Sequence, residues 1–161
     1  MAMMPIEWTM RYIAELVAPL VTIERIDKGI FGEGSSRLVL PIPKGAEYGF
    51  QIHVYEQETI QIHAELIGLP KAYFWYEDFE LCSLEPIELL KEQFLSHLGK
   101  VLKYPTYIEQ KRGWFFCDFS CWYYLMNEWK PLPGVGCLQN AFDVPEIDGK
   151  TRIYHSPALL K

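Results

Sequence analysis

The sequence contains no apolar stretch that approaches the ~18–20 residues of a membrane-spanning helix. Residues Met1 to Trp8 also lack the basic segment and the following apolar run that make up a secretory signal peptide. We therefore expect a soluble, cytoplasmic protein that does not act at a membrane.

Basic residues are few relative to acidic ones. The chain has 15 Lys and Arg against 21 Asp and Glu, which gives a net charge of −6 at pH 7. Binding a nucleic-acid backbone needs a concentrated basic surface, so this balance argues against a nucleic-acid partner. The acidity instead favours a basic protein as the partner.

Neither a zinc motif nor a disulfide framework is present. The four cysteines include no CxxC pair. Cys117 and Cys121 fall in one predicted strand and would lie about 13 Å apart at ~3.3 Å per residue. Bridged Cα atoms lie within about 7 Å, so this pair cannot form a disulfide. We predict buried, reduced thiols that pack as small apolar groups.

Motifs of known enzyme classes are missing as well. The sequence has no GxSxG elbow, P-loop, HExxH helix or paired-carboxylate motif. The glycine-rich stretch at residues 29–34 lacks the lysine that follows the last glycine of a P-loop, and Glu33 would repel a phosphate. These absences favour a non-enzymatic role, and we predict no cofactor.

What the chain does contain is a large apolar and aromatic fraction. Of its 161 residues, 50% are hydrophobic and 15% are aromatic, which suits one domain with a sizeable core. We predict a single domain over residues 1–161. From about residue 130 onward, Pro and Gly become frequent and predict an irregular C-terminal segment.

Two helices are predicted from apolar residues at three- and four-residue spacing. The first covers about residues 5–18 and begins at Pro5, a favourable first-turn residue. The second covers about residues 85–103 and begins near Pro86. Lys100 and Lys103 lie at its end, where positive charge suits the helix dipole.

Most other segments alternate as strands do. Strands are predicted near residues 20–26, 37–42, 71–81 and 151–154, with hairpins at 49–66 and 105–129. The expected fold class is therefore α+β: a mainly antiparallel sheet of about five to seven strands, with the long helix packed on one face.

The strongest strand pattern runs from residue 115 to residue 125. The odd positions are all apolar, and the even positions are aromatic except for Asp118 and Ser120. A strand that is apolar on both faces is typical of the middle of a sheet. We predict that the odd-numbered face packs against the long helix.

The even-numbered face of this strand is the first candidate site. Trp and Tyr are enriched in ligand grooves and protein interfaces, and a carboxylate among them can mark a functional site. Alternatively, Asp118 pairs with Lys111 or Arg112 on the neighbouring strand. The predicted binding surface comprises Trp114, Asp118, Ser120, Trp122, Tyr124 and Trp75.

A histidine pair in the hairpin at residues 49–66 is the second candidate site. Its apolar residues share one face only if the loop has an odd number of residues. With the loop at residues 57–59, His53 faces His63; with the loop at residues 56–58, each histidine faces a glutamine. His53, His63 and Glu65 could then form a two-histidine, one-carboxylate metal site. The alternative is an ordinary polar face turned to solvent.

These features favour a small, non-enzymatic protein-binding module that uses an aromatic, acidic surface, by analogy with inhibitor and immunity proteins. The alternative is a small-molecule-binding protein or metal-assisted enzyme with a site near His53 and His63. A homodimer formed through the aromatic surface is a third option.

Overall fold

The computed structural model describes residues 15, 25–28, 35–55, 59–67, 73–80, 87–112, 116–136, 139–140 and 151–160. The helix predicted for residues 5–18 lies outside these residues, apart from Glu15, which is helical. The predicted glycine-rich loop at residues 29–34 also lies outside them.

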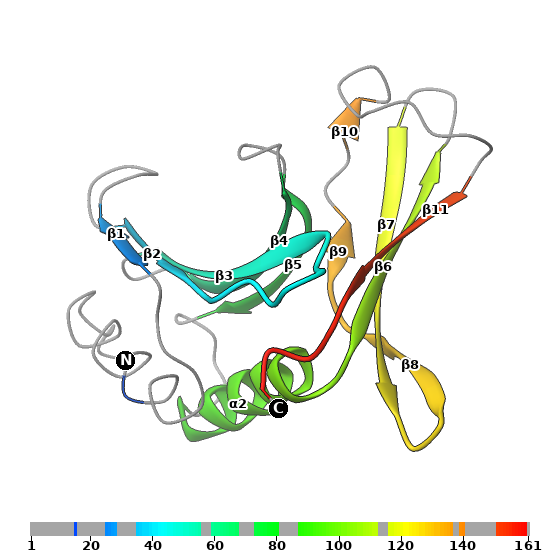
Figure 1. Ribbon diagram of the computed structural model, residues 1–161. Helices are drawn as coiled ribbons and strands as arrows, with labels where there is room; N and C mark the ends of the chain where they lie inside the picture. The colour runs from blue at the N-terminus through cyan, green and yellow to red at the C-terminus, as the bar shows by residue number, and fades with distance from the viewer. Residues whose placement is uncertain are drawn as a thin grey trace.

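The N-terminal half of the described chain forms a curved antiparallel sheet, called the first sheet here. Its strand order is β1-β2-β3-β4-β5-β9, and each neighbouring pair is antiparallel (Figure 1). Its strands are β1 (Arg25–Lys28), β2 (Ser35–Val39), β3 (Tyr48–Tyr55), β4 (Thr59–Leu66), β5 (Tyr73–Glu80) and β9 (Val135–Gly136).

A second antiparallel sheet stands beside the first (Figure 1). Its order is β10-β7-β6-β11, and β8 also pairs with β7. As predicted, the long aromatic strand lies in the middle of its sheet. The strands are β6 (Thr106–Arg112), β7 (Phe116–Leu125), β8 (Glu128–Leu132), β10 (Gln139–Asn140) and β11 (Thr151–Ser156).

The α+β class dominated by antiparallel sheet is confirmed, but the prediction of one sheet of about five to seven strands is not. The described strands form one sheet of six strands and another of five. In the chain, helix α2 (Ile87–Lys103) lies between β5, a strand of the first sheet, and β6, the first strand of the second sheet. The segment after residue 130 also contains more strand than predicted, since β9 joins the first sheet while β10 and β11 join the second.

One apolar core lies between the two sheets and α2. The helix spans nearly the predicted range of 85–103 and lies against the first sheet (Figure 1). The odd-numbered face of β7 points into the core, as predicted. The core includes Phe50, Ile52 and Ile62 from the first sheet, Phe94, Leu98 and Val101 from α2, and Phe119, Cys121 and Tyr123 from β7.

Cys121 is a free thiol within this core. Burial raises the pKa of its thiol, so the sulfur stays protonated and packs as an apolar group. The prediction of a buried, reduced cysteine is confirmed at this position.

Hydrogen bonds between distant segments hold the two sheets together. The hydroxyl groups of Tyr48 on β3 and Thr106 on β6 are bonded to each other in the interior. The backbone N–H of Glu47 donates to the carbonyl of His155 at 2.9 Å, and the backbone N–H of His155 donates to the Glu47 carboxylate at 2.8 Å. Both links join the start of the β3–β4 hairpin to the second sheet.

None of the helices in the described residues is long and apolar enough to cross a membrane.

Candidate functional site

The exposed face of the second sheet carries a cluster of aromatic side chains. Trp122 and Tyr124 lie at even positions of β7 and point away from the core. Directly paired residues of antiparallel strands share a face. The pairs Tyr107↔Trp122, Tyr124↔Trp129 and Tyr107↔His155 therefore bring all five side chains together. We call Tyr107, Trp122, Tyr124, Trp129 and His155 the aromatic face.

Tyr107 lies at the centre of the aromatic face. Its ring stacks beside Trp122, with centroids 6.0 Å apart and an interplanar angle of 15°. Trp129 meets Tyr107 edge-on at 4.6 Å, and His155 lies 6.3 Å away on the other side. Tyr124 and Trp129 lie 5.0 Å apart, and Trp129 is 40% exposed. The rings therefore support one another while leaving aromatic surface in contact with solvent.

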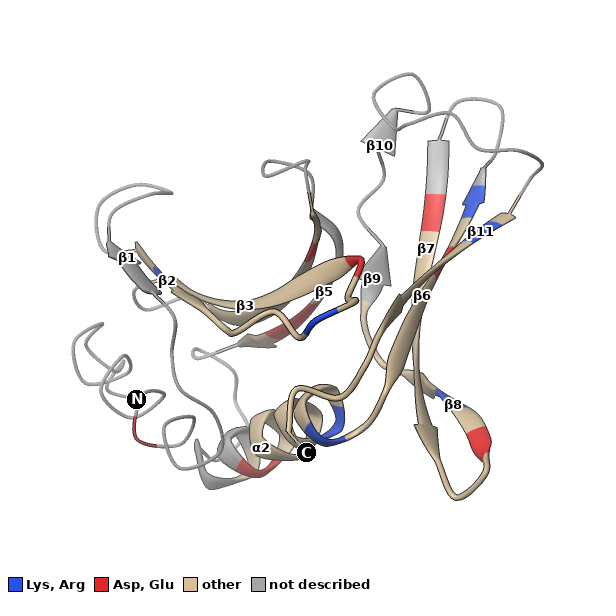
Figure 2. Ribbon diagram, viewed as in Figure 1, with Lys and Arg blue, Asp and Glu red and all other residues tan. Residues whose placement is uncertain are grey.

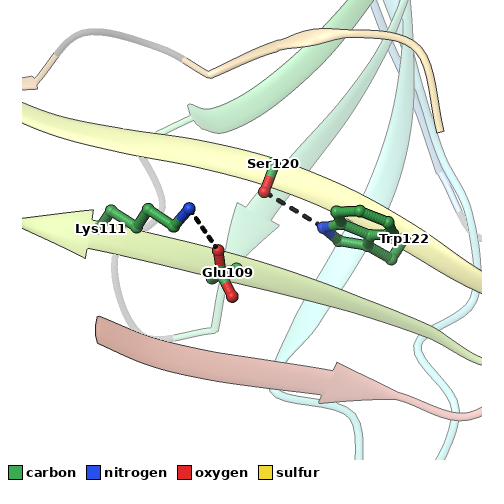
Figure 3. A network of polar contacts seen from close by, with 4 residues as sticks. All are labelled: Glu109, Lys111, Ser120 and Trp122. Atoms are coloured by element: carbon green, nitrogen blue, oxygen red, sulfur yellow. Dashed lines mark hydrogen bonds and ion pairs between the residues drawn. The ribbon is translucent and has the colours of Figure 1, made fainter. Parts of the chain in front are cut away.

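Beyond the aromatic face, the same side of β6 and β7 becomes polar. We call the residues there, Glu109, Lys111, Asp118 and Ser120, the polar half. Lys111 Nζ lies 3.3 Å from Glu109 Oε1, and the indole N–H of Trp122 donates to Ser120 Oγ at 3.2 Å (Figure 3). The second bond satisfies the only polar atom of the Trp122 side chain and orients its ring. In Figure 2, the charged residues of β6 and β7 lie toward the upper end of these strands.

Asp118 is exposed on this polar half, directly opposite Lys111 in the ladder. Lys111 forms an ion pair with Glu109 on its own strand. The side chain of Arg112, the other predicted partner, lies outside the described residues. Because the Asp118 carboxylate is in water, it needs no buried partner of the kind that the sequence pattern suggested.

One described residue of the predicted surface, Trp75, is not part of this face. Trp114 lies outside the described residues. Trp75, on β5, is fully buried and packs against Phe50 and His97 at centroid distances of 6.4 and 5.5 Å. Its burial on the core side of the first sheet corrects the expectation that it belongs to the binding surface with the even-numbered face of β7.

The sequence analysis did not predict three residues of the aromatic face: Tyr107, Trp129 and His155. Trp129 could have been found by continuing the alternation of β7 through the next turn, which is a two-residue turn at Met126 and Asn127. Tyr107 could have been found from the register of the predicted 105–129 hairpin, which pairs it with Trp122. His155 depends on the pairing of β11 with β6, which no local pattern indicates.

The turn between β7 and β8 displays an apolar side chain beside this face. Met126 and Asn127 have φ angles of 53° and 64°, the signature of a type I′ hairpin turn. Positive φ is unusual for Met and costs about 1 kcal/mol. The Met126 side chain is 83% exposed. In the chain Met126 lies between Tyr124 and Trp129, two residues of the aromatic face.

The histidine pair lies on the first sheet, on the face opposite the core. The ladder pairs Gln51 with His63 and His53 with Gln61, so the loop occupies residues 56–58, the second of the two predicted registers. The two imidazole rings stack diagonally, with centroids 3.9 Å apart and planes 18° from parallel.

Two parallel chains of hydrogen bonds run through this polar face. The Glu65 carboxylate accepts from the Gln51 amide N–H, and the Gln51 amide oxygen is 3.0 Å from His53 Nε2. In the same way, Asp78 accepts from Gln61, whose amide oxygen is bonded to His63 Nε2. An amide oxygen can only accept, so each histidine donates through Nε2 and carries its lone pair on Nδ1.

The part of this polar face around His53 and His63 is buried, contrary to the alternative of an ordinary face turned to solvent, whereas Asp78 is exposed. His53 is 0% exposed and His63 is 3% exposed. Burial lowers the pKa of His53 to about 2, with smaller contributions from the neighbouring His63 and Arg37, and it lowers the pKa of His63 to about 4. Both rings are therefore neutral at pH 7.

The predicted metal site at His53, His63 and Glu65 stays a prediction. In the part of the chain that the structure describes, no group of three or more His, Cys, Asp or Glu side chains is arranged to hold a metal ion. The Glu65 carboxylate accepts a hydrogen bond from Gln51, which is also bonded to His53. Glutamine therefore connects the carboxylate to the imidazole.

Comparisons with protein-family models, curated proteins and solved structures gave no significant match.

Proposed function

We propose that this protein is a non-enzymatic binding module that docks a partner protein on its aromatic face. The observation that supports this proposal most is the group of partly exposed Trp and Tyr rings on one side of the second sheet. Water solvates such a surface poorly, so covering it with an apolar partner surface releases free energy.

The residue types also suit a protein interface. Trp and Tyr dominate the binding energy at protein interfaces, because they bury large areas and lose few rotatable bonds. Here the rings are already packed against one another, so little ordering is needed when a partner binds. Met126 extends the apolar area at one end of the face.

The chemistry of the face indicates what the partner presents. An apolar segment would cover the rings of Trp122 and Trp129. A basic group beside it would meet Asp118 and Glu109 on the polar half. Lys111 already lies beside Glu109, so the contribution of charge is small and the rings supply most of the affinity. This chemistry fits an inhibitor-type role toward a basic protein, and it is the sole support for that role.

Photo-crosslinking can identify the partner and test the face together. A benzoylphenylalanine at Tyr124 should capture a partner in native extract, and the same group at Ile42, an exposed apolar residue of the other half of the chain, should not. With the purified partner, Trp129→Ala should weaken binding about 30-fold, the ~2 kcal/mol typical of an interface hot spot.

Ile42→Ala is the matched control and should leave the affinity unchanged. Circular dichroism melting of each variant separates lost binding from lost folding. The proposal is wrong if Trp122→Ala, Trp129→Ala and Asp118→Ala all bind every identified partner as tightly as the original chain does.

Native mass spectrometry of protein purified without chelator distinguishes this proposal from its two alternatives. A stoichiometric metal that is lost on His53→Ala or His63→Ala would support the metal-assisted alternative. A metal-free dimer that dissociates on Trp129→Ala would indicate that the aromatic face binds a second copy of the chain.

A further inference from the structure

A cavity of about 490 Å³ opens between β5 and α2, on the opposite side of β5 from the histidine pair. Asp78 is the one residue that belongs both to its described lining and to the hydrogen-bond chains of the histidine pair. β5 pairs with β9 only at Trp75 and Tyr76, and within the described residues no strand pairs with this edge of β5 beyond them. The open edge forms one wall and α2 the other, with Pro133 at the end. This volume is within the ordinary range of small-molecule sites, about 300–1,000 Å³.

The walls carry more negative than positive charge. Two carboxylates face the cavity, from Glu77 on β5 and Glu92 on α2, while the Asp78 carboxylate lies on the opposite face of β5, where it accepts from Gln61. Acidic residues are visible on both elements in Figure 2. Lys100 is the one basic residue of the lining, and its Nζ lies 5.6 Å from the centre of the Tyr123 ring. In the described part of the chain, neither Glu77 nor Glu92 forms an ion pair.

Glu77 is held in a setting that disfavours its negative charge. Partial burial, and to a smaller extent the adjacent Asp78, raise the pKa of the Glu77 carboxyl. A cation bound in the cavity would reverse both effects by replacing lost hydration and offsetting the charge of Asp78. The site is therefore better matched to a positive ligand than to an empty, water-filled state.

His97 of α2 adds a buried polar atom to the lining. It is 5% exposed, stacks on Trp75 with planes 15° apart, and meets Phe79 edge-on at 5.6 Å. Burial, and secondarily Lys100, lower its pKa to about 3, so the ring is neutral. Among the residues that the structure describes, its Nε2 has no hydrogen-bond partner. A buried polar atom without a hydrogen bond raises the free energy of the folded protein, and a hydrogen-bond donor on a ligand can remove this penalty.

We propose that this cavity binds a primary ammonium or guanidinium group carried on a short apolar stem. The carboxylates of Glu77 and Glu92 flank the cationic head, and the neutral His97 imidazole offers a further acceptor. Phe79, Leu89 and Pro133 contact the stem. The ligand is a free amine or a Lys or Arg side chain of another protein. The site does not depend on the proposed function of the aromatic face.

Agmatine is a suitable probe, because it carries a guanidinium and an ammonium on a four-carbon stem. In ¹H–¹⁵N correlation spectra, agmatine should cause saturable shifts of residues on β5 and α2, whereas neutral butanol should cause none. Glu77→Gln and Glu92→Gln should each weaken agmatine binding at least threefold, and the double variant at least tenfold. Glu128→Gln, a matched charge change on the exposed β7–β8 hairpin, should have no effect.

A second measurement monitors a carboxyl group of the site directly. Saturating agmatine should lower the pKa of Glu77, measured from its side-chain carboxyl ¹³C shift. Titration with N-acetyl-lysine amide and N-acetyl-arginine amide distinguishes the sources of the ligand. Tighter binding of these capped residues than of agmatine indicates a protein side chain, and the reverse indicates a free amine.

The proposal is overturned if neither agmatine nor the capped residues bind saturably up to roughly 10 mM, which corresponds to a very weak site. It is equally overturned if butanol binds as well as agmatine, or if the Glu77→Gln/Glu92→Gln double variant binds agmatine normally.

Discussion

Acid should destabilise this protein well before its carboxylates are protonated, because it buries three neutral histidines. His53, His63 and His97 have folded-state pKa values of about 2, 4 and 3. In the unfolded chain a histidine titrates near pH 6.5. As the pH falls through 6.5 the unfolded state takes up protons that the folded state cannot, so stability is present above this pH and is lost below it.

The size of the effect follows from these values. Each buried histidine changes the free energy of unfolding by about 1.4 kcal/mol per pH unit between its folded pKa and 6.5. Between pH 7 and pH 5 this amounts to about 2 kcal/mol per histidine and about 6 kcal/mol for the three together. A domain has only about 5–15 kcal/mol of stability, so the loss is a large share of the total.

Urea unfolding at pH 7, 6 and 5, followed by tryptophan fluorescence and by circular dichroism, measures this loss directly. His97→Phe keeps an aromatic ring beside Trp75 and removes one titrating group, so it should reduce the loss by about 2 kcal/mol. His155→Gln changes an exposed histidine of the aromatic face and should leave the loss unchanged.

Two results would refute this reasoning. One is a free energy of unfolding that changes by less than about 1 kcal/mol between pH 7 and pH 5. The other is an NMR titration in which the folded His53 or His63 ring takes up a proton above pH 6 without unfolding. Either would mean that the stacked rings accept charge in the folded state.

Three further predictions concern backbone positions and are checked by the same urea unfolding at pH 7. A Cβ at Gly134 would overlap the buried Trp75 indole, so Gly134→Ala should destabilise the protein by about 1–3 kcal/mol. Gly99 in α2 has open space at its Cβ position, so Gly99→Ala should stabilise by about 0.5–1 kcal/mol; a loss would mean that the helix is packed more closely there. Met126→Asn should stabilise by about 0.5 kcal/mol, because Asn adopts positive φ more readily; an unchanged midpoint would argue against strain in this turn.

The sequence was sufficient to predict which residues share a face. Alternation with period two put Phe119, Cys121 and Tyr123 on one side of β7 and Trp122 and Tyr124 on the other, and burial agrees. The three- and four-residue spacing likewise located the long helix to within about two residues at its start. These features depend only on neighbours along the chain, so a local pattern carries them.

Alternation along the chain could not predict which of these faces is buried. His53 and His63 alternate with apolar residues just as exposed polar residues do, yet they are buried. Trp75 has the same strand pattern as Trp122, yet one lies in the core and the other is partly exposed on the aromatic face. Burial depends on segments that are distant in the sequence, and period-two alternation contains no information about them.

The sequence by itself therefore determined the long helix, the main strands between residues 35 and 125, the two faces of each hairpin and the odd length of the β3–β4 loop. Only the tertiary structure decided that the strands divide into two sheets, that β11 pairs with β6 to bring His155 beside Tyr107, and that the open edge of β5 meets α2 around a cavity. The physical reason is that hydrogen bonding along a strand is the same for any partner strand. The choice of partner is made by the packing of the whole core.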